Sequence, residues 1–350
     1  MIRLMKGNLL TAEADALVNT VNCAGFMGKG IALQFKQAFP ENFREYAKAC
    51  KAGEVQPGRM LVHDTGSMVN PRYVINFPTK RHWRGKSRIE DIESGLAALV
   101  GVVLRLGIRS IAIPPLGCGL GGLRWDAVQP MIEGHFAGLP EVEALLFAPE
   151  GAPDPRDMPV NTARPEMTPA RALFVKLMDQ YQELSYRLTL LEVQKLAYFM
   201  QESGEPLRLR YEAGIYGPYA DNLNKVLERM EGHFLRGYGD SQRPDVELEL
   251  LPGAVAEADA LLRTFPDAVK RLGRVSGLIE GFETPYGMEL LSSTHWVVMH
   301  SGKPSSNVED AIEAVHRWNE RKATMFRIDH IRKAWDRLAS QGWFALHPPV

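Results

Sequence analysis

Two glycine-rich stretches of the chain could offer backbone N–H groups to phosphate. The first covers residues 19–32 (NTVNCAGFMGKGIA) and the second covers residues 114–122 (PPLGCGLGG). Each follows an apolar run and precedes a helix-like pattern, so each stands where a strand passes into a helix. Glycine lets the backbone approach a ligand closely, and a helix N-terminus carries unpaired N–H groups. Because open α/β sheets bind ligands beyond the carboxyl ends of their strands, the two stretches predict one shared diphosphate site.

The residues around these glycines narrow the kind of ligand. Asn22 lies in the first stretch, where its short amide could bond the hydroxyl groups of a ribose. The second stretch lacks the GKS or GKT ending of a Walker A loop and does not follow the GxGxxG pattern. Neither a P-loop nor a dinucleotide-binding fold is therefore indicated. For either stretch taken alone, the alternative is a loop that serves only the fold.

A third stretch, residues 76–88 (NFPTKRHWRGKSR), is basic and also leaves an apolar run before a helix-like pattern. This is the position from which an α/β sheet presents functional groups. Trp83 interrupts the charges, and a basic groove with an aromatic platform is how many proteins hold single-stranded nucleic acid. The alternative is an ordinary solvated basic loop. The spacing of Cys, His and carboxylate residues indicates no metal site, so we expect neither a metal nor another cofactor.

The elements that would position these residues alternate between strands and helices. Strand-like runs cover residues 15–21, 73–77, 110–114 and 142–147, and helix-like runs cover residues 30–39, 42–52, 89–106 and 125–136. Such alternation predicts an α/β layer fold with a mostly parallel sheet. We expect this domain to cover residues 1–150.

The second half of the chain has a different character. Residues 151–165 carry Pro, Gly and Asp without periodicity, which is typical of a linker. Apolar residues then recur at helical spacing, and residues 166–350 predict a mostly helical domain with a small β element. The expected helices cover residues 169–200, 223–231, 254–272, 308–323 and 328–340, and the expected strands cover residues 207–211 and 246–251.

Bulk composition excludes several classes of protein. The net charge of the 350 residues is −1, so a nucleic-acid surface would have to be local. The three cysteines show no CxxC spacing, which disfavours a disulfide framework and fits a reducing cytoplasm. The chain shows no signal peptide and no apolar stretch long enough to span a bilayer, so we expect a cytoplasmic protein without a membrane partner.

The motifs together resemble those of the macrodomain family. The resemblance rests on GNLL at residues 7–10 and on the two glycine-rich stretches in this order. It implies a three-layer α/β/α fold with a mixed sheet for residues 1–150, and it implies binding of ADP-ribose. Asn8 and Leu9 match the adenine end, and Asn22 matches the asparagine at the distal ribose. The remaining ADP-ribose contacts that the resemblance implies are Thr20, Gly28, Gly30, Ile31, Thr79, Gly117, Cys118, Gly119, Leu120, Gly121 and Gly122.

The segment NFPTKRHWRGKS is similar to one branch of macrodomains, which contains the terminal ADP-ribose protein glycohydrolase and the DarG antitoxins. In that branch a lysine that matches Lys80 is catalytic. DarG enzymes remove ADP-ribose from thymine in single-stranded DNA and so reverse their toxin partner DarT. The resemblance therefore implies ADP-ribosylated single-stranded DNA as substrate and a DarT-like toxin as partner. The residues expected to bind DNA are Arg81, His82, Trp83 and Arg84.

One departure affects the mechanism. The protein-deacylating relative carries an acidic residue in its second glycine loop, where this chain has Gly121 and Gly122. Lys80 therefore lacks that partner. Two roles are open for it in a reaction with an oxocarbenium-like transition state: a desolvated amine that attacks the anomeric carbon, or an ammonium that stabilises the leaving thymine. The alternative functions are a non-catalytic ADP-ribose reader and a hydrolase of ADP-ribosylated protein.

The second half also carries a resemblance. QKLAYFMQ at residues 194–201, followed by YGPY at residues 216–219, is similar to the SocA-like antitoxin family. Together with the DarG resemblance this implies a toxin-binding domain. Asp245, Glu247 and Glu249 alternate along an expected strand and would share one face, which would suit DNA mimicry as well as an ordinary exposed strand.

Overall fold

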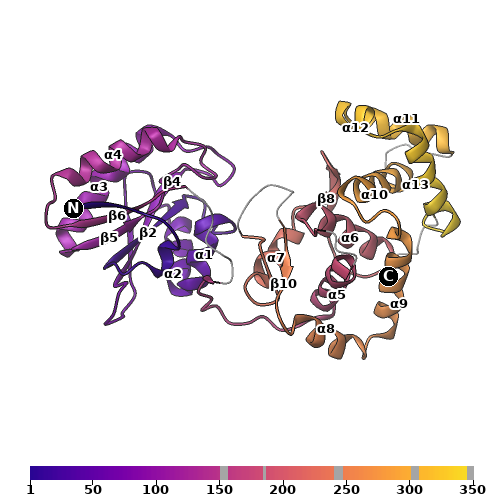
Figure 1. Cartoon of the computed structure of the whole chain (residues 1–350), viewed down its shortest axis with the longest axis horizontal. Helices are drawn as coiled ribbons and strands as arrows, with labels where there is room; N and C mark the ends of the chain where they lie inside the picture. The colour runs from indigo at the N-terminus through magenta and orange to yellow at the C-terminus, as the bar shows by residue number, and fades with distance from the viewer. Residues whose placement is uncertain (150–156, 184–186, 240–246, 301–306, 345–350) are drawn as a thin grey trace. The chain divides into compact units, whose positions relative to one another are not determined.

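The computed structural model describes residues 1–149, 157–183, 187–239, 247–300 and 307–344 (Figure 1). The chain divides into two compact units. The first is built from Met1–Arg164, and the second mainly from Pro165–Tyr238 and Arg243–Val350. Of the linker expected over residues 151–165, residues 151–156 lie outside the described residues. Asn161 belongs to the first unit, where its backbone N–H donates to the carbonyl of Gln37 at 2.8 Å.

A six-stranded mixed sheet forms the centre of the first unit. Its order is β1-β6-β5-β2-β4-β3, and only the β3–β4 pair is antiparallel. Four of the strands were expected, whereas the edge strands β1 and β3 were not, because each is short and carries charged residues. The strands are β1 (Ile2–Met5), β2 (Ala16–Asn22), β3 (Leu61–Asp64), β4 (Tyr73–Lys80), β5 (Ser110–Ile113) and β6 (Glu143–Phe147).

Helices cover both faces of this sheet, which confirms the three-layer fold. Ala16 and Val18 of β2 pack into the cluster that holds the apolar residues of α3 and α4. Leu17, which points to the opposite face, packs with Phe35 of α1. A strand covered on both faces is buried along nearly its whole length, as β2 is, where only Thr20 is half-buried. The helices are α1 (Gly30–Ala38), α2 (Pro40–Lys51), α3 (Ile89–Leu106) and α4 (Trp125–Ala137), and a short 3₁₀ helix covers Leu9–Thr11.

Gly95 brings α3 unusually close to β4. A Cβ atom at this position would lie 2.2 Å from the ring of Phe77, so only glycine fits. Phe77 is fully buried, and the strand that contains it continues to Lys80. The helix therefore fixes the strand that ends at the candidate site.

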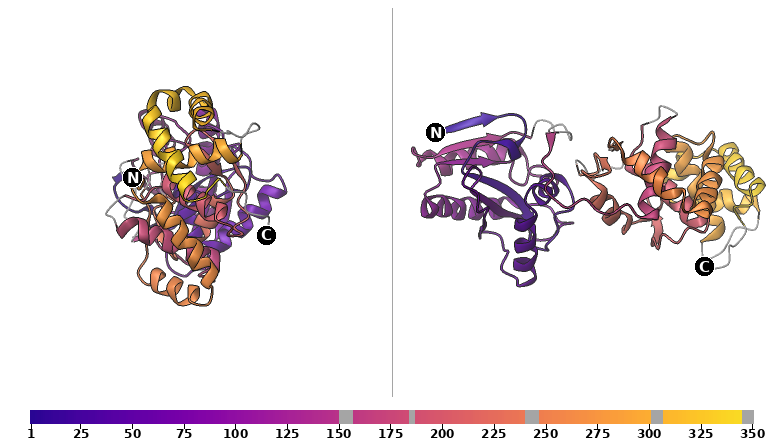
Figure 2. Two further views of the ribbon diagram at one scale, coloured as in Figure 1. Left: turned by 90° about the vertical axis from the view of Figure 1, so that its right-hand side faces the viewer. Right: turned by 90° about the horizontal axis from the view of Figure 1, so that it is seen from below.

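The second unit is mostly helical, as expected, and it carries two small hairpins where one small β element was expected (Figures 1 and 2). No described helix is both long and apolar enough to cross a bilayer. The helices are α5 (Pro169–Glu183), α6 (Leu190–Glu202), α7 (Leu223–Met230), α8 (Ala254–Leu262), α9 (Pro266–Ile279), α10 (Pro285–Met299), α11 (Val308–Trp318), α12 (Glu320–Met325) and α13 (Ile328–Ser340). The hairpins pair β7 (Tyr211–Gly214) with β8 (Gly217–Ala220), and β9 (Leu235–Arg236) with β10 (Glu249–Leu250).

Several expected boundaries in this unit were wrong, for identifiable local reasons. The long helix expected over residues 169–200 is two helices, and a capping box between Thr189 and Glu192 starts the second one. Pro266 at the first turn of α9 and Asn319 at the N-cap of α12 divide two other expected helices in the same way. Helix α10 was missed because its buried surface includes four consecutive polar residues, 292–295.

The β elements of this unit also differ from expectation. The strand expected over residues 207–211 lies later, at β7, and pairs with β8 around a turn at Ile215 and Tyr216. Of the strand expected over residues 246–251, only β10 forms, and Asp245 lies outside the described residues. Glu247 forms an isolated bridge to Thr189, so the proposed acidic face is not a continuous strand.

Candidate active site at the ends of β2 and β4

The carboxyl ends of β2 and β4 lie side by side and bring Asn22 opposite Lys80. The parallel register pairs Val21 with Pro78 and then shifts, so that Asn22 pairs with Lys80 and Thr79 is skipped. Proline has no N–H to donate to the ladder, and a bulge at this point re-aims the residues that follow. We expected the strand to end at Phe77, but it continues to Lys80, which is therefore held by the sheet rather than by a loop.

Asn22 is buried and its side chain organises the first glycine-rich stretch. Its Oδ1 accepts from the backbone N–H of Ala24 at 2.9 Å, and its Nδ2 donates to the carbonyl of Phe26 at 2.5 Å. The hydroxyl of Tyr46, from α2, donates to the Asn22 carbonyl at 2.6 Å and lies 3.2 Å from Oδ1. Burial raises the pKa of Tyr46, which keeps the hydroxyl a donor. Nothing in the sequence pointed to Tyr46, whose spacing marks it only as an apolar-face residue of a helix.

Lys80 links this edge of the sheet to the second glycine-rich stretch. Its Nζ donates to the carbonyl of Leu120. The side chain is half-buried, and burial lowers its pKa. A Cβ atom at Gly30 would lie 3.7 Å from the Leu120 side chain, so the start of α1 meets the same residue. Lys80 forms no ion pair within the described part of the chain. Three elements thus converge at Leu120: the end of β4, the start of α1 and the second loop.

The second loop owes its path to its glycines. Gly117 and Gly122 have φ angles of +71° and +77°, which other residues rarely adopt. At Gly121 a Cβ atom would lie 2.2 Å from the Oγ of Ser87 and 2.3 Å from the carbonyl oxygen of Gly117. No side chain fits there, which gives a physical reason for the missing acidic residue. Ser87, which the sequence did not single out, is buried, and its hydroxyl has no hydrogen-bond partner in the described part of the chain.

The same loop presents unpaired backbone donors. The N–H groups of Gly119, Leu120 and Gly121 have no acceptor among the described residues, whereas those of the flanking residues do. Successive N–H groups of this kind form a nest that suits a diphosphate. Cys118 lies in this loop, and burial raises its pKa to about 11, which disfavours a nucleophilic thiolate.

In the basic loop after Lys80, one arginine is held in an ion pair and the remaining basic residues face solvent. Arg81 donates to both carboxylate oxygens of the buried Asp91, at 3.0 and 3.3 Å, which ties the loop to α3. The guanidinium of Arg84 lies 4.4 Å from the centroid of the Trp83 ring, and the ring of His82 lies 5.5 Å from it. Arg81 is exposed but its guanidinium is engaged in this ion pair, whereas His82, Arg84, Lys86 and Arg88 are exposed around the half-buried Trp83.

The other expected contact residues occupy several positions around these loops. Asn8 caps the 3₁₀ helix through Leu10 at 3.0 Å and also donates to the carbonyl of Asp157. Leu9 is buried beside Ile31 of α1. Thr79 is buried, with its hydroxyl 3.5 Å from the carbonyl of Val21. The half-buried residues are Thr20 in β2 and Gly28 in the first loop.

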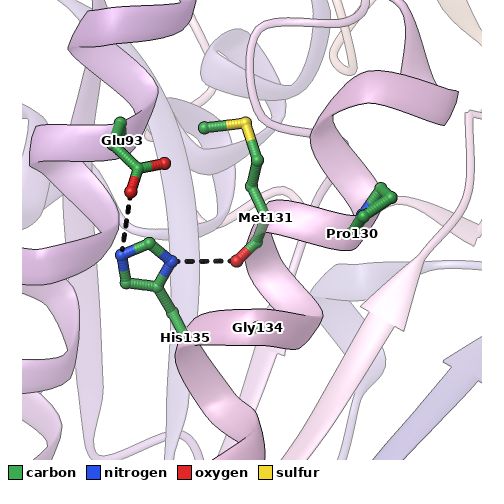
Figure 3. A pocket seen from close by; sticks show the side chains of 5 residues that line it. All are labelled: Glu93, Pro130, Met131, Gly134 and His135. Carbon is green, nitrogen blue, oxygen red and sulfur yellow. Dashed lines mark hydrogen bonds and ion pairs between the residues drawn. The ribbon is translucent and has the colours of Figure 1, made fainter.

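Two other features are accounted for by the fold. A shallow hollow on α3 and α4 is lined by Glu93 and by His135, whose Nδ1 donates to the Met131 carbonyl at 2.9 Å. The hollow includes no residue of the site above (Figure 3).

In the second unit, Glu202, His295 and His300 bring ligand atoms within 4.8 Å of one another. Both nitrogens of His295 already have partners, so its packing needs no metal.

Comparisons with known proteins find relatives of the first unit and of nearly the whole chain. Residues 18–132 match the Macro domain family. The chain is 46% identical to a DNA ADP-ribosyl glycohydrolase of Thermus aquaticus over 99% of this chain and 95% of that protein. It is 33% identical to a DNA ADP-ribosyl transferase-DNA ADP-ribosyl glycohydrolase fusion protein of Thermosipho africanus over 42% of each. The solved macrodomain of Mycobacterium tuberculosis DarG is 52% identical over 43% of this chain and 99% of that one, with a TM-score of 0.43.

Proposed function

The chain belongs to the DNA ADP-ribosyl glycohydrolase family of macrodomain enzymes, and from this premise we propose what it acts on and how. It hydrolyses the bond between ADP-ribose and thymidine in single-stranded DNA, and so reverses a DNA ADP-ribosyltransferase toxin. The observation that carries the proposal is the convergence at Leu120, where Lys80 meets the loop whose three successive N–H groups have no acceptor among the described residues.

Recognition of ADP-ribose follows from the backbone. The N–H groups of residues 119–121 would hold the diphosphate. The N-terminus of α1 has no side-chain cap at Lys29, so its first turn and the positive end of its dipole would assist. Asn22 stands at the edge of the sheet beside Lys80, which suits the distal ribose. The sugar carbon that is attacked would then lie next to the amine of Lys80.

Two chemical roles of Lys80 are compatible with its surroundings. In one, Nζ forms a bond to the anomeric carbon as the bond to thymine breaks and thymine takes up a proton. The ribose ring then opens to a Schiff base, which water hydrolyses to release ADP-ribose and the free amine. In the other, an Nζ–H group donates to the departing thymine while water attacks the sugar. Burial lowers the pKa of Lys80, which populates the free amine that the first role needs. Borohydride reduction during turnover separates the roles, because only the first leaves ADP-ribose covalently attached to the protein.

The substrate is tested by comparing two modified polymers. Wild type and Lys80→Ala are incubated with ADP-ribosylated single-stranded DNA and with protein ADP-ribosylated on glutamate, and released ADP-ribose is scored. We expect wild type to act on the DNA and Lys80→Ala to be inactive. Wild type that spares the DNA but acts on protein would indicate a protein hydrolase. If neither protein releases ADP-ribose from either polymer and both still bind free ADP-ribose, the chain would be a non-catalytic reader. The DNA substrate implies an enzyme of the cytoplasm, in keeping with its free cysteines.

The second unit is proposed to bind the cognate DarT-like toxin. Its β7–β8 hairpin exposes apolar surface at the turn, where Ile215 is 66% exposed and Tyr216 and Tyr219 are 37% exposed. Exposed apolar side chains that lie together can form a protein-binding surface. Two side chains hold the hairpin against the end of α11: Trp318 Nε1 donates to the Gly214 carbonyl at 3.1 Å, and Asn319 Nδ2 donates to the Ile215 carbonyl at 3.2 Å.

Two full-length variants test toxin binding. Ile215→Asp should weaken association with the toxin, because it puts a charge in the apolar contact. Val269→Asp alters another exposed apolar residue, on α9, and serves as control. Lys80→Ala should bind the toxin as wild type does. Unchanged affinity of Ile215→Asp would exclude the hairpin as the contact.

A further inference from the structure

Phe26 is an exposed aromatic residue at the candidate site. Its side chain is 53% exposed, although it belongs to the first glycine-rich loop of an otherwise apolar-core domain. Its ring centroid lies 5.9 Å from that of Trp83, in the basic loop after Lys80. Trp83 is itself covered by His82 and by the guanidinium of Arg84. The open aromatic face is therefore that of Phe26, with Trp83 as its support.

The position of Phe26 is fixed by the residue opposite Lys80. The Asn22 amide donates to the Phe26 carbonyl at 2.5 Å, and its Oδ1 lies 3.4 Å from the Phe26 N–H. Asn22 pairs with Lys80 across the two strands. Phe26 thus lies four residues after Asn22, and Trp83 lies three residues after Lys80, so both aromatic residues follow the paired strand ends. The aromatic face borders the point where the glycosidic bond would lie.

The charges around this face suit a nucleic-acid strand. Arg84, Lys86 and Arg88 are exposed in the same loop, which leaves cations for phosphate. Exposed aromatic faces beside cations are the usual way to hold unpaired bases, since every base has a π face to stack. A protein substrate carries no base to fill such a platform.

We propose that Phe26, supported by Trp83, stacks against a nucleobase that neighbours the modified thymidine and so selects ADP-ribosylated DNA. This inference rests on the proposed function and adds a substrate contact outside the ADP-ribose pocket. It predicts that a substitution of Phe26 weakens binding only of substrates in which other bases flank the modified thymidine.

Steady-state kinetics with two substrates tests the proposal. One substrate is an ADP-ribosylated single-stranded oligonucleotide, and the other is ADP-ribosylated thymidine without neighbours. Phe26→Ala should raise KM for the oligonucleotide about 5- to 150-fold, the range that one stacked base contributes, with kcat unchanged. KM for the nucleoside and the affinity for free ADP-ribose should stay as in wild type. Phe26→Tyr should restore the wild-type KM, because it keeps the aromatic face.

The control and the contradicting results are distinct. Met68→Ala truncates a fully exposed apolar side chain between β3 and β4, at the other end of β4, and should change neither KM. An unchanged oligonucleotide KM for Phe26→Ala, or an equal loss on the nucleoside or on ADP-ribose, would overturn the inference. Wild type that cleaves neither DNA substrate refutes the proposed function instead. In that case the role of Phe26 is tested by measuring the affinity for unmodified single-stranded DNA by anisotropy. Undiminished affinity of Phe26→Ala would overturn the inference as well.

Discussion

A single methyl group at Gly121 should disable the second loop. The added Cβ atom would lie 2.2 Å from the Ser87 Oγ and 2.3 Å from the Gly117 carbonyl oxygen. Ordinary contacts between heavy atoms are about 3.5–4.0 Å, so the loop must move by about 1 Å or more. Ser87 can rotate away, but the Gly117 carbonyl is backbone and cannot. Gly119 is the matched control, because a Cβ atom there meets nothing within 4 Å.

The displacement has a calculable effect on the free energy of ligand binding. It strains the hydrogen bonds from the Ser87 N–H to the Gly121 carbonyl and from the Gly122 N–H to the Gly119 carbonyl, both 3.0 Å long. Each contributes a net ~1 kcal/mol. Overpacking adds a cost of ~1–3 kcal/mol. We expect ~1.4–3 kcal/mol of this total cost to appear as a loss of binding free energy at the N–H groups of residues 119–121. Such a loss lowers the affinity for ADP-ribose ~10- to 150-fold.

Calorimetry with free ADP-ribose measures this effect. We expect Gly121→Ala to lose affinity by that factor and Gly119→Ala to bind as wild type does. Adding Ser87→Ala to Gly121→Ala should recover only part of the loss, because the Gly117 carbonyl still collides with the new methyl group. Wild-type affinity of Gly121→Ala, or an equal loss for Gly119→Ala, would show that this loop does not form the phosphate site.

Three further predictions concern support and stability. Tyr46→Phe removes the donor to the Asn22 carbonyl and should weaken ADP-ribose binding by ~1 kcal/mol, or ~5-fold, in calorimetry; unchanged affinity would deny its positioning role. Gly95→Ala should lower the free energy of unfolding in urea by ~1–3 kcal/mol or more, whereas Gly101→Ala, on the open face of the same helix, should raise it by ~0.5–1 kcal/mol. Burial lowers the pKa of His295 from 6.5 to about 4, so the unfolded state binds the proton that the folded state excludes. Stability should therefore decline as pH falls from 6.5 to 4, by ~3 kcal/mol in total, and urea midpoints of His295→Gln should lack this component.

The sequence contained enough to predict the layers of the first unit, and it singled out the two glycine-rich loops. Buried strands such as β6 contain continuous apolar runs, and the glycines of the loops mark a backbone path that other residues rarely follow. The basic stretch after the expected strand drew attention by its place, and Lys80 within it was singled out by the resemblance to one branch of macrodomains. That Lys80 ends the strand itself was not foreseen, because the strand was expected to end at Phe77, before the bulge at Thr79.

The supporting residues could not be found from the sequence, because their roles depend on contacts between distant segments. Tyr46 meets Asn22 across 24 residues, and Ser87 lies against Gly121 only after the loop has closed. In the second unit, helix boundaries depend on caps such as Thr189, which interrupt an apolar period that continues on both sides. The resemblance of this unit to SocA-like antitoxins stays a prediction.

The account is tested most directly by the single-turnover rate at which saturating Lys80→Ala releases ADP-ribose from modified single-stranded DNA. Because the lysine is proposed to act on the sugar or on the leaving base, its loss should slow release at least ~100-fold, while calorimetry still detects bound ADP-ribose. A Lys80→Ala enzyme that releases ADP-ribose at the wild-type rate would contradict the account.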